Sequence, residues 1–341
     1  MRYPAIAATA LVLSLIPLHA QSADTQKAQI SRILETFQES VVNEPGTNLK
    51  ITKLINFQSE HYANINKALN IQYTYPQGFQ IDEHNDALYV LRYSNGHPAR
   101  CIIEKYRWSS GSLITTYIVK EPQASTSESI IVDHLDGQNF LYIRSDNKLA
   151  QYRLIEPIDA FGSTEKITDL YDNVAQSFYR KNNIWYLEKY RTNPDMIGQS
   201  RGEYSVADKN FKHVKDISFP AQYAGYRESK DYDIPKHQGF AVMDDGYIMS
   251  MGGFWSDKTK TGPYNYYGVN IFNADGSIRN SYYISPKILF SELAKFGIHA
   301  SRNENEGIQV MNDGSIVVLQ VLKTKEQPTG QLAFIKFSLP L

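Results

Sequence analysis

The chain has 341 residues, of which 42% are hydrophobic and 21% are charged, and its formal net charge at pH 7 is -1. Such a balanced charge gives no support for a nucleic-acid partner or an anionic membrane surface, because both select clustered Lys and Arg. Cys101 is the single cysteine, which excludes an intrachain disulfide, and its apolar neighbours in RCIIEKYRW predict a small core residue, not a nucleophile.

Residues 1–23 have the pattern of a secretory signal peptide. Arg2 gives a basic start, an apolar run extends from Ala5 to Leu18, and small residues follow, with cleavage expected near Ala20 or Ala23. The apolar run is too short to span a bilayer comfortably, and no later segment approaches that length. We therefore expect an exported chain, secreted or periplasmic, without an integral membrane segment once it is mature.

Residues 24–46 predict an N-terminal helix that ends at the turn sequence NEPG. The apolar residues that recur at three- and four-residue spacing are Ile30, Ile33, Leu34, Phe37 and Val41. Beyond this segment, short runs rich in Val, Ile, Tyr and Phe alternate with polar turns, a pattern typical of β-strands. One further helix is predicted over 285–297, where Gly297 provides a stop signal.

A degenerate motif recurs through the strand-rich part. Each copy has Gln or Glu, then Gly or Ser, then Phe or Ile, followed by a strand, a tight polar turn and a second apolar strand. The copies begin at Gln77, Glu128, Gln176, Gln238 and Glu306. Their spacing of 48 to 68 residues suits four-stranded units with variable loops. The last unit lacks an outer strand, which residues 49–57 can supply, so that no sheet edge is left open. The sequence thus predicts an all-β fold, a five-bladed β-propeller over 47–341, with the helix 24–46 packed outside.

Long connections collect on one predicted face of this propeller. The turns between first and second strands and between third and fourth strands are short. The long connections span 190–203, 219–237, 252–268, 285–305 and 322–331. Long loops on a rigid scaffold are a common place for function, and the Gln/Glu ring should rim the central channel on the same face.

The side chains of that face suit a carbohydrate, because aromatic rings cover C–H patches and polar groups bond hydroxyls. The candidate ligand-binding residues are Gln77, Glu128, Gln176, Gln238, Glu306, His237, Tyr226, Arg227, Trp255 and Tyr266. Two structural alternatives stay open. The tyrosines can instead pack the loops, and the Gln/Glu side chains can instead bond the neighbouring blade and lock the ring.

Glu128 and Glu306 are the two carboxylates of the ring, in the blades that flank the first. Glycoside hydrolysis needs two acids, so this pair is the catalytic candidate of an alternative function, a glycan-processing hydrolase or lyase. The sequence contains no HxH, HExxH or CxxC spacing, so no metal site is indicated. It has no GxSxG or GxGxxG motif either, and we expect no cofactor, leaving open a cation in the central channel.

The QGF, QSF and QGF starts, each followed by a strand, a polar turn and an LYV- or IWYL-type strand, resemble TagC-like β-propellers over roughly 48–341. That group includes receptor-binding propellers of staphylococcal phages, with helveticin-type bacteriocins as distant relatives. The resemblance implies a five-bladed propeller that binds cell-surface glycopolymers, without catalytic residues to transfer. Gln77, Gln176 and Gln238 match the family's inner-strand start, whereas Glu128 and Glu306 depart from it. The expected signal peptide favours a host-encoded exported protein over a phage tail component.

We therefore expect an exported, monomeric propeller whose partner is a glycan or glycopolymer. The enzyme is the first alternative. A protein-binding propeller is the second.

Overall fold

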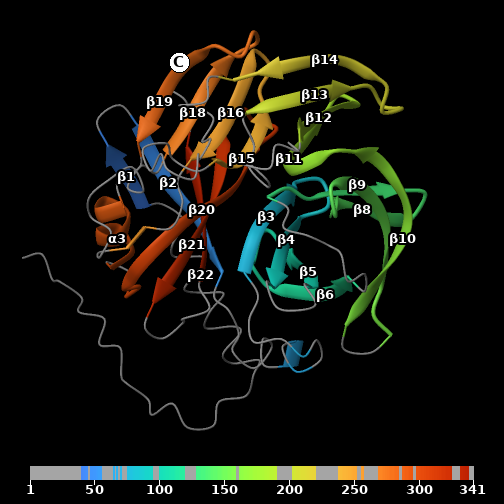
Figure 1. The fold of residues 1–341 in the computed structure, drawn as a ribbon. Helices are drawn as coiled ribbons and strands as arrows, with labels where there is room; N and C mark the ends of the chain where they lie inside the picture. Colours follow the sequence, from blue (N-terminus) through green and yellow to red (C-terminus); the bar gives the residue numbers. More distant parts are fainter. Residues whose placement is uncertain are drawn as a thin grey trace, which may run out of the picture.

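The computed structural model describes residues 40–44, 47–55, 64–65, 67, 70, 75–94, 100–119, 128–158, 161–189, 202–219, 237–251, 255–256, 268–283, 286–294, 297–324 and 331–337. Its strands gather into mostly antiparallel sheets placed around a common centre (Figure 1). Helix α3 (Pro286–Ala294) lies beside β1 and β20. No helix in the described part of the chain is both long and apolar enough to cross a membrane.

The described strands form four sheets, of eight, six, four and four strands, which we divide into five units numbered from the inner strand outward. The eight-stranded sheet comprises units 1 and 2, whose outer strands pair in parallel where Gly162 lies opposite Tyr117. Unit 1 contains β3 (Tyr75–Asp82), β4 (Ala87–Ser94), β5 (Arg100–Arg107) and β6 (Leu113–Val119). Unit 2 contains β7 (Ile131–Leu135), β8 (Gln138–Ser145), β9 (Lys148–Ile155) and β10 (Gly162–Asp172). Unit 3 contains β11 (Val174–Lys181), β12 (Ile184–Lys189), β13 (Glu203–Ala207) and β14 (His213–Ser218). Unit 4 contains β15 (His237–Val242), β16 (Gly246–Met251), β18 (Gly268–Asn273) and β19 (Ile278–Tyr283).

Unit 5 joins the two ends of the strand-rich region. It contains β20 (Ala300–Val310), β21 (Ile316–Thr324), β22 (Gln331–Phe337) and β2 (Thr47–Ile55), with β1 (Ser40–Glu44) outside β2 and β17 (Trp255–Ser256) on the inner edge. β2 pairs antiparallel with β22, from Leu49 opposite Phe337 to Ile55 opposite Leu332. The predicted pairing of residues 49–57 with the last unit is therefore confirmed.

The predicted helix over 24–46 is wrong at its C-terminal end. Residues Ser40–Glu44 form strand β1, which pairs with β2 from Ser40 opposite Ile51 to Glu44 opposite Thr47. Val41 and Val42 are β-branched, and the outer edge of β2 offers backbone partners that a helix would leave unused. Residues 24–39 lie outside the described residues. The later predicted helix is confirmed as α3, which is followed by Gly297 at φ 78°.

Apolar clusters fill the seams between neighbouring units. Separate clusters lie between units 1 and 2, 2 and 3, 3 and 4, 4 and 5, and 5 and 1, so the contacts close a ring and the arrangement is propeller-like. Cys101 is 1% exposed in the seam between units 1 and 2, as predicted for a core residue. The seam between units 2 and 3 has the smallest described cluster, with seven buried residues against fourteen between units 1 and 2.

Candidate functional site

The repeated motif coincides with irregularities in the inner strands. In units 1, 3, 4 and 5 the pairing of the first two strands shifts register at or beside the motif, for example between Pro76 and Gly78 and between His237 and Gly239. Such β-bulges bend a strand and re-aim a side chain. The Gln or Glu of each copy therefore lies where the regular alternation of the strand is interrupted.

The second motif position is small because neighbouring inner strands almost touch there. A Cβ on Gly78 would lie 2.8 Å from the backbone oxygen of Glu128, and a Cβ on Gly239 would lie 2.8 Å from Cα of Gly307. In unit 2 the position is Ser129, whose Oγ accepts a hydrogen bond from the backbone N–H of Phe178 at 3.0 Å. The Gly/Ser position is therefore explained by the close approach of backbones around the centre.

The Gln/Glu side chains also make contacts from one unit to the next. Gln77 Nε2 donates to Glu306 Oε1 at 3.4 Å, and Gln238 Nε2 donates to Glu304 Oε1 at 3.1 Å. Glu128 Oε2 accepts a hydrogen bond from Ser177 Oγ of unit 3 at 3.3 Å. These contacts support the alternative in which the ring links neighbouring units, while its role in ligand binding stays a prediction.

The two candidate acids are deeply buried. Glu128 is 3% exposed and Glu306 is 1% exposed, and each contacts a neighbouring unit as described above. Another buried carboxylate beside the motif was not predicted: Glu188 of β12 accepts hydrogen bonds from the backbone amides of Gln176 at 2.9 Å and Ser177 at 2.7 Å. It thereby satisfies two N–H groups freed by the bulge of unit 3. A catalytic role for Glu128 and Glu306 stays a prediction.

The centre retains a cavity on the side where the inner strands end. Its volume is about 240 Å³, and residues of the inner strands line it, among them Gln80, Tyr179, Arg180 and Gln309. Burial raises the pKa of Tyr179 to about 12, so this phenol is neutral near pH 7. Within the described residues, no three His, Cys, Asp or Glu side chains converge as a metal site.

The loop residues predicted to bind ligand fall largely outside the description. Tyr226, Arg227 and Tyr266 lie outside the described residues. For His237 and Trp255 the backbone alone is described: His237 opens β15 opposite Met251, and Trp255 lies in β17 opposite Asn303 of β20. The connection after β16 therefore returns to the inner edge of unit 5.

A groove of about 790 Å³ lies between units 2 and 3 on the face where inner strands begin, here called the long-loop face. The placement follows from the chain, because Asn173 directly precedes inner strand β11 and Lys148 opens β9. The residues that line this Tyr171 groove are Lys148, Asp169, Leu170, Tyr171, Asp172, Asn173, Leu187, Lys189 and Ser205.

Polar groups in the Tyr171 groove hold one another in place. Lys148 Nζ lies 3.2 Å from Asp172 Oδ1 and 3.7 Å from Asp169 Oδ2, and its hydrogen bond to Asp172 raises the pKa of the lysine. The Tyr171 hydroxyl and Ser205 Oγ share a hydrogen bond of 2.9 Å. The groove thus presents carboxylates, ammonium groups and a phenol beside apolar Leu170 and Leu187, a combination that can bond hydroxyls and cover C–H surface.

Sequence reasoning missed this groove. Its local signal is the run TDLYDN at 168–173, where acids and an amide surround a tyrosine just before an inner strand. Lys148, Lys189 and Ser205 join it from three other strands.

No protein-family model matches this chain, and no curated protein matches it. Among solved structures it is similar to the tail fibre of Staphylococcus aureus phage P68, with 15% identity and a TM-score of 0.55, covering 92% of this chain and 56% of that one. An exo-β-1,3-galactanase from Phanerochaete chrysosporium has 10% identity, coverage of 78% and 61%, and a TM-score of 0.42. A glutaminyl cyclase from Myxococcus xanthus has 8% identity, coverage of 86% and 97%, and a TM-score of 0.42.

Scores of 0.42 are too low to relate this chain to either enzyme. The tail-fibre match indicates a shared fold, over little more than half of the tail-fibre chain.

Proposed function

We propose that this chain is an exported, five-bladed β-propeller of the TagC-like kind that binds a carbohydrate or cell-surface glycopolymer through its long-loop face. The five described units, the closed ring of seams and the β2–β22 pair support the blade count. The structural likeness to a staphylococcal phage tail fibre supports the same family as the QGF-type starts. Secretion or a periplasmic location rests on the pattern of residues 1–23.

The Tyr171 groove is the observation that carries the proposed binding. It lies on the face predicted from the loops, and its volume of about 790 Å³ is within the range of roughly 300–1,000 Å³ usual for small-ligand pockets. Asp169 and Asp172 provide acceptors for sugar hydroxyls, Lys148 provides a donor, and the Tyr171 ring can lie against a C–H face. Free glycan hydroxyls need both donors and acceptors, and this groove supplies both within one rim.

A glycan array probed with the mature chain tests the proposal. Tyr171→Ala removes the ring proposed to lie against a C–H face of the sugar, and Asp172→Asn removes the charge of an exposed carboxylate. The matched control is Asp136→Asn, which changes an exposed aspartate in the β7–β8 turn at the other end of unit 2. We expect the glycans retained by the unchanged chain to bind about tenfold more weakly in each groove variant, because one loses an aromatic contact and the other a hydrogen bond to a charged group.

The control should bind as the unchanged chain does. Absence of any retained glycan, or equal retention by the groove variants and the control, would contradict the proposed function.

A further inference from the structure

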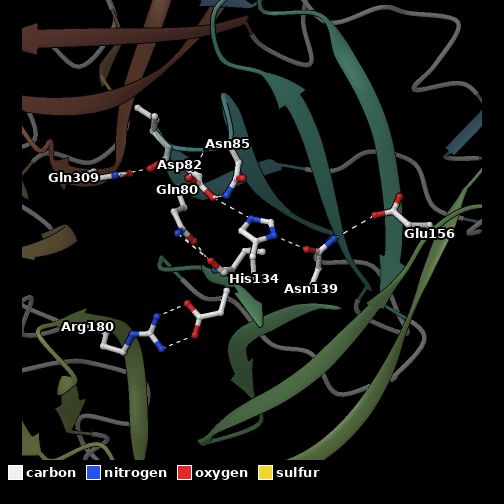
Figure 2. Close-up of polar contacts among 11 residues, drawn as sticks. Gln80, Asp82, Asn85, His134, Asn139, Glu156, Arg180 and Gln309 are labelled. Carbon is white, nitrogen blue, oxygen red and sulfur yellow. Dashed lines mark hydrogen bonds and ion pairs between the residues drawn. The ribbon is translucent and has the colours of Figure 1, made fainter. Parts of the chain in front are cut away.

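Units 5, 1 and 2 are joined by side-chain amides at one repeated position. Gln309 of unit 5 accepts a hydrogen bond from Ile81 N–H at 2.7 Å and donates to the Ile81 carbonyl at 2.8 Å. Gln80 of unit 1 makes the same pair of hydrogen bonds with the backbone of Val132 in unit 2. It donates to the Val132 carbonyl at 3.2 Å and accepts from the Val132 N–H (Figure 2). Each glutamine lies two residues after the glycine of its motif.

The seam between units 2 and 3 is built differently. The corresponding position has no side-chain amide in units 2, 3 and 4, where it is Ile131, Tyr179 and Ala241, so this bridge is confined to the seams that unit 1 shares with units 5 and 2. Instead, Arg180 of β11 donates to both carboxylate oxygens of Asp133, with Nη1 2.6 Å from Oδ2 (Figure 2). The guanidinium is also stacked, with Cζ 5.1 Å from the Trp185 ring and 5.7 Å from the Tyr142 ring. Arg180 is thus a cation fixed in position while 26% of its side chain stays exposed.

A cavity of about 390 Å³ opens beside this arginine on the face where the inner strands end. We call it the Trp185 pocket. The residues that line it are Asp133, His134, Leu135, Tyr142, Gln151, Leu170, Arg180, Asn183, Trp185, Lys209 and Phe211. It is a mixed pocket, with aromatic rings, amides and charged groups, on the opposite end of the seam from the Tyr171 groove.

Phe211 of the Trp185 pocket has a backbone conformation that bulky residues avoid. Its φ is +61°, in the left-handed region, and its ring lies 5.0 Å from that of Trp185. The corresponding third-to-fourth turns of units 1 and 4 have Gly111 and Gly276 at positive φ, where glycine is free of steric cost. The ring packs against the apolar cluster of this seam and lies 6.4 Å from the Tyr171 ring, so packing holds it in place as a wall of the pocket.

The charges of the pocket favour an anion. Arg180 and Lys209 bring two positive charges, and the Asp133 carboxylate that lines the pocket balances one of them. His134 is held by protein partners, because its Nε2 lies 2.9 Å from the carboxylate of Asp82 and its Nδ1 contacts Asn139 Oδ1 (Figure 2). Arg180 uses two of its five N–H donors on Asp133, so donors remain for a ligand carboxylate.

We propose that the Trp185 pocket binds an acidic sugar residue of the hexuronate class. The carboxylate of the sugar lies against Arg180 and Lys209, and its C–H face lies against Phe211. Asn183 and Gln151 are placed to bond its hydroxyls. Leu170 lines both this pocket and the Tyr171 groove, and the Phe211 ring lies 6.4 Å from the Tyr171 ring. Lys209 lines the Trp185 pocket and not the groove, so its substitution tests this proposal apart from binding at the long-loop face.

Isothermal titration of the mature chain with sodium glucuronate, glucose and sodium acetate tests this proposal. The sugar acid should bind saturably, and the neutral sugar and the simple carboxylate should not. Lys209→Met should weaken glucuronate binding about tenfold, the effect of losing a charge-assisted hydrogen bond. Lys212→Met is the matched control, because it removes an exposed lysine of the same turn that does not line the pocket, and it should leave binding unchanged.

A second variant, Phe211→Gly, relieves the left-handed strain and removes the aromatic wall. We expect it to fold and to lose glucuronate binding about tenfold, because the sugar face loses its apolar contact. Unchanged binding in either Lys209→Met or Phe211→Gly would overturn the proposal. So would the absence of glucuronate binding, equal binding of glucose, or an equal loss in Lys209→Met and Lys212→Met.

Discussion

Substituting Gly239 by alanine tests whether the repeated motif is fixed by backbone packing. The new Cβ would lie 2.8 Å from Cα of Gly307, 2.9 Å from its carbonyl carbon and 2.9 Å from the amide nitrogen of Ile308. All three are backbone atoms of β20, which is held in a ladder with β21, so no side-chain rotation can relieve the contact. The φ of Gly239 is outside the left-handed region, which leaves steric crowding as the cause of any loss.

The size of the loss follows from two opposing effects. Forcing an extra methyl group into a packed site costs about 1–3 kcal/mol, and a rigid backbone neighbour puts this site toward the upper value. Alanine also has fewer conformations than glycine in the unfolded chain, which stabilises the folded state by about 0.4–1 kcal/mol and offsets part of that cost. We therefore expect Gly239→Ala to lower the free energy of unfolding by about 2 kcal/mol.

Ser177→Ala is the matched control at the same motif position in unit 3. A Cβ is already accommodated there, so the variant loses the 3.3 Å hydrogen bond to Glu128, about 1 kcal/mol. Urea unfolding followed by far-UV circular dichroism, with linear extrapolation, measures both. A Gly239→Ala protein as stable as the unchanged chain, or a Ser177→Ala protein that is the less stable of the two, would refute the packing explanation.

Three further outcomes are expected. Gln309→Ala removes both hydrogen bonds between the Gln309 amide and the backbone of Ile81, and it should lower the free energy of unfolding by about 2 kcal/mol in the same urea assay. An unchanged free energy of unfolding would show that these two bonds do not stabilise the ring. Lys336 and Ser315 hold the pKa of Asp313 at about 2, below its usual 3.8, so the stability this carboxylate adds is present above pH 3.8 and is lost as pH falls toward 2. Lys336→Met should raise that pKa in an NMR titration, and an unmoved value would show that the lysine is not its cause. Burial raises the pKa of the Cys101 thiol to about 12, so a thiol reagent at pH 8 should label it after unfolding alone; rapid labelling of the folded chain would contradict its placement in the core.

The ring closure could be predicted because the last unit lacks a fourth strand of its own. The last unit ends after three strands, and an unpaired edge needs a partner, so an apolar segment before the first unit was the natural candidate. The structure places β2 there over Thr47–Ile55. The positions of the motif copies were also readable, since a repeated pattern needs no knowledge of the fold.

The reason for the motif could not be read from the sequence. Whether Gly78 is needed for flexibility or for space depends on Glu128, which lies fifty residues away and whose backbone oxygen would be 2.8 Å from an added Cβ. The hydrogen bonds of Gln80 and Gln309 to the neighbouring unit could have been predicted, because both residues lie two positions after the glycine of their motif. Helical spacing misled at β1, where pairing with β2 outweighed the three- and four-residue periodicity that includes Val41.

The Tyr171 groove illustrates a different limit. Asp172 and Tyr171 are neighbours in sequence, but Lys189 and Ser205 reach them only through the packing of unit 3 against unit 2. No spacing rule joins these four residues, because the groove belongs to a seam and not to any one strand. The loop residues Tyr226, Arg227 and Tyr266 lie outside the described residues, so their predicted role stays a prediction.

Departures from the repeat are the better guide to function in a ring of this kind. Positions that every unit shares serve closure, as Gly78 and Gly239 do, and their substitution should damage stability before binding. Phe211 departs from the glycine found at the corresponding turns of units 1 and 4, and it accepts a left-handed backbone that costs roughly 1–2 kcal/mol where glycine would cost little. The seam between units 2 and 3 has the smallest described apolar cluster and a cavity at each end. Phe211 also packs against this cluster, so packing alone can account for its retention. Glucuronate titration of Phe211→Gly therefore decides whether a ligand uses the ring as well.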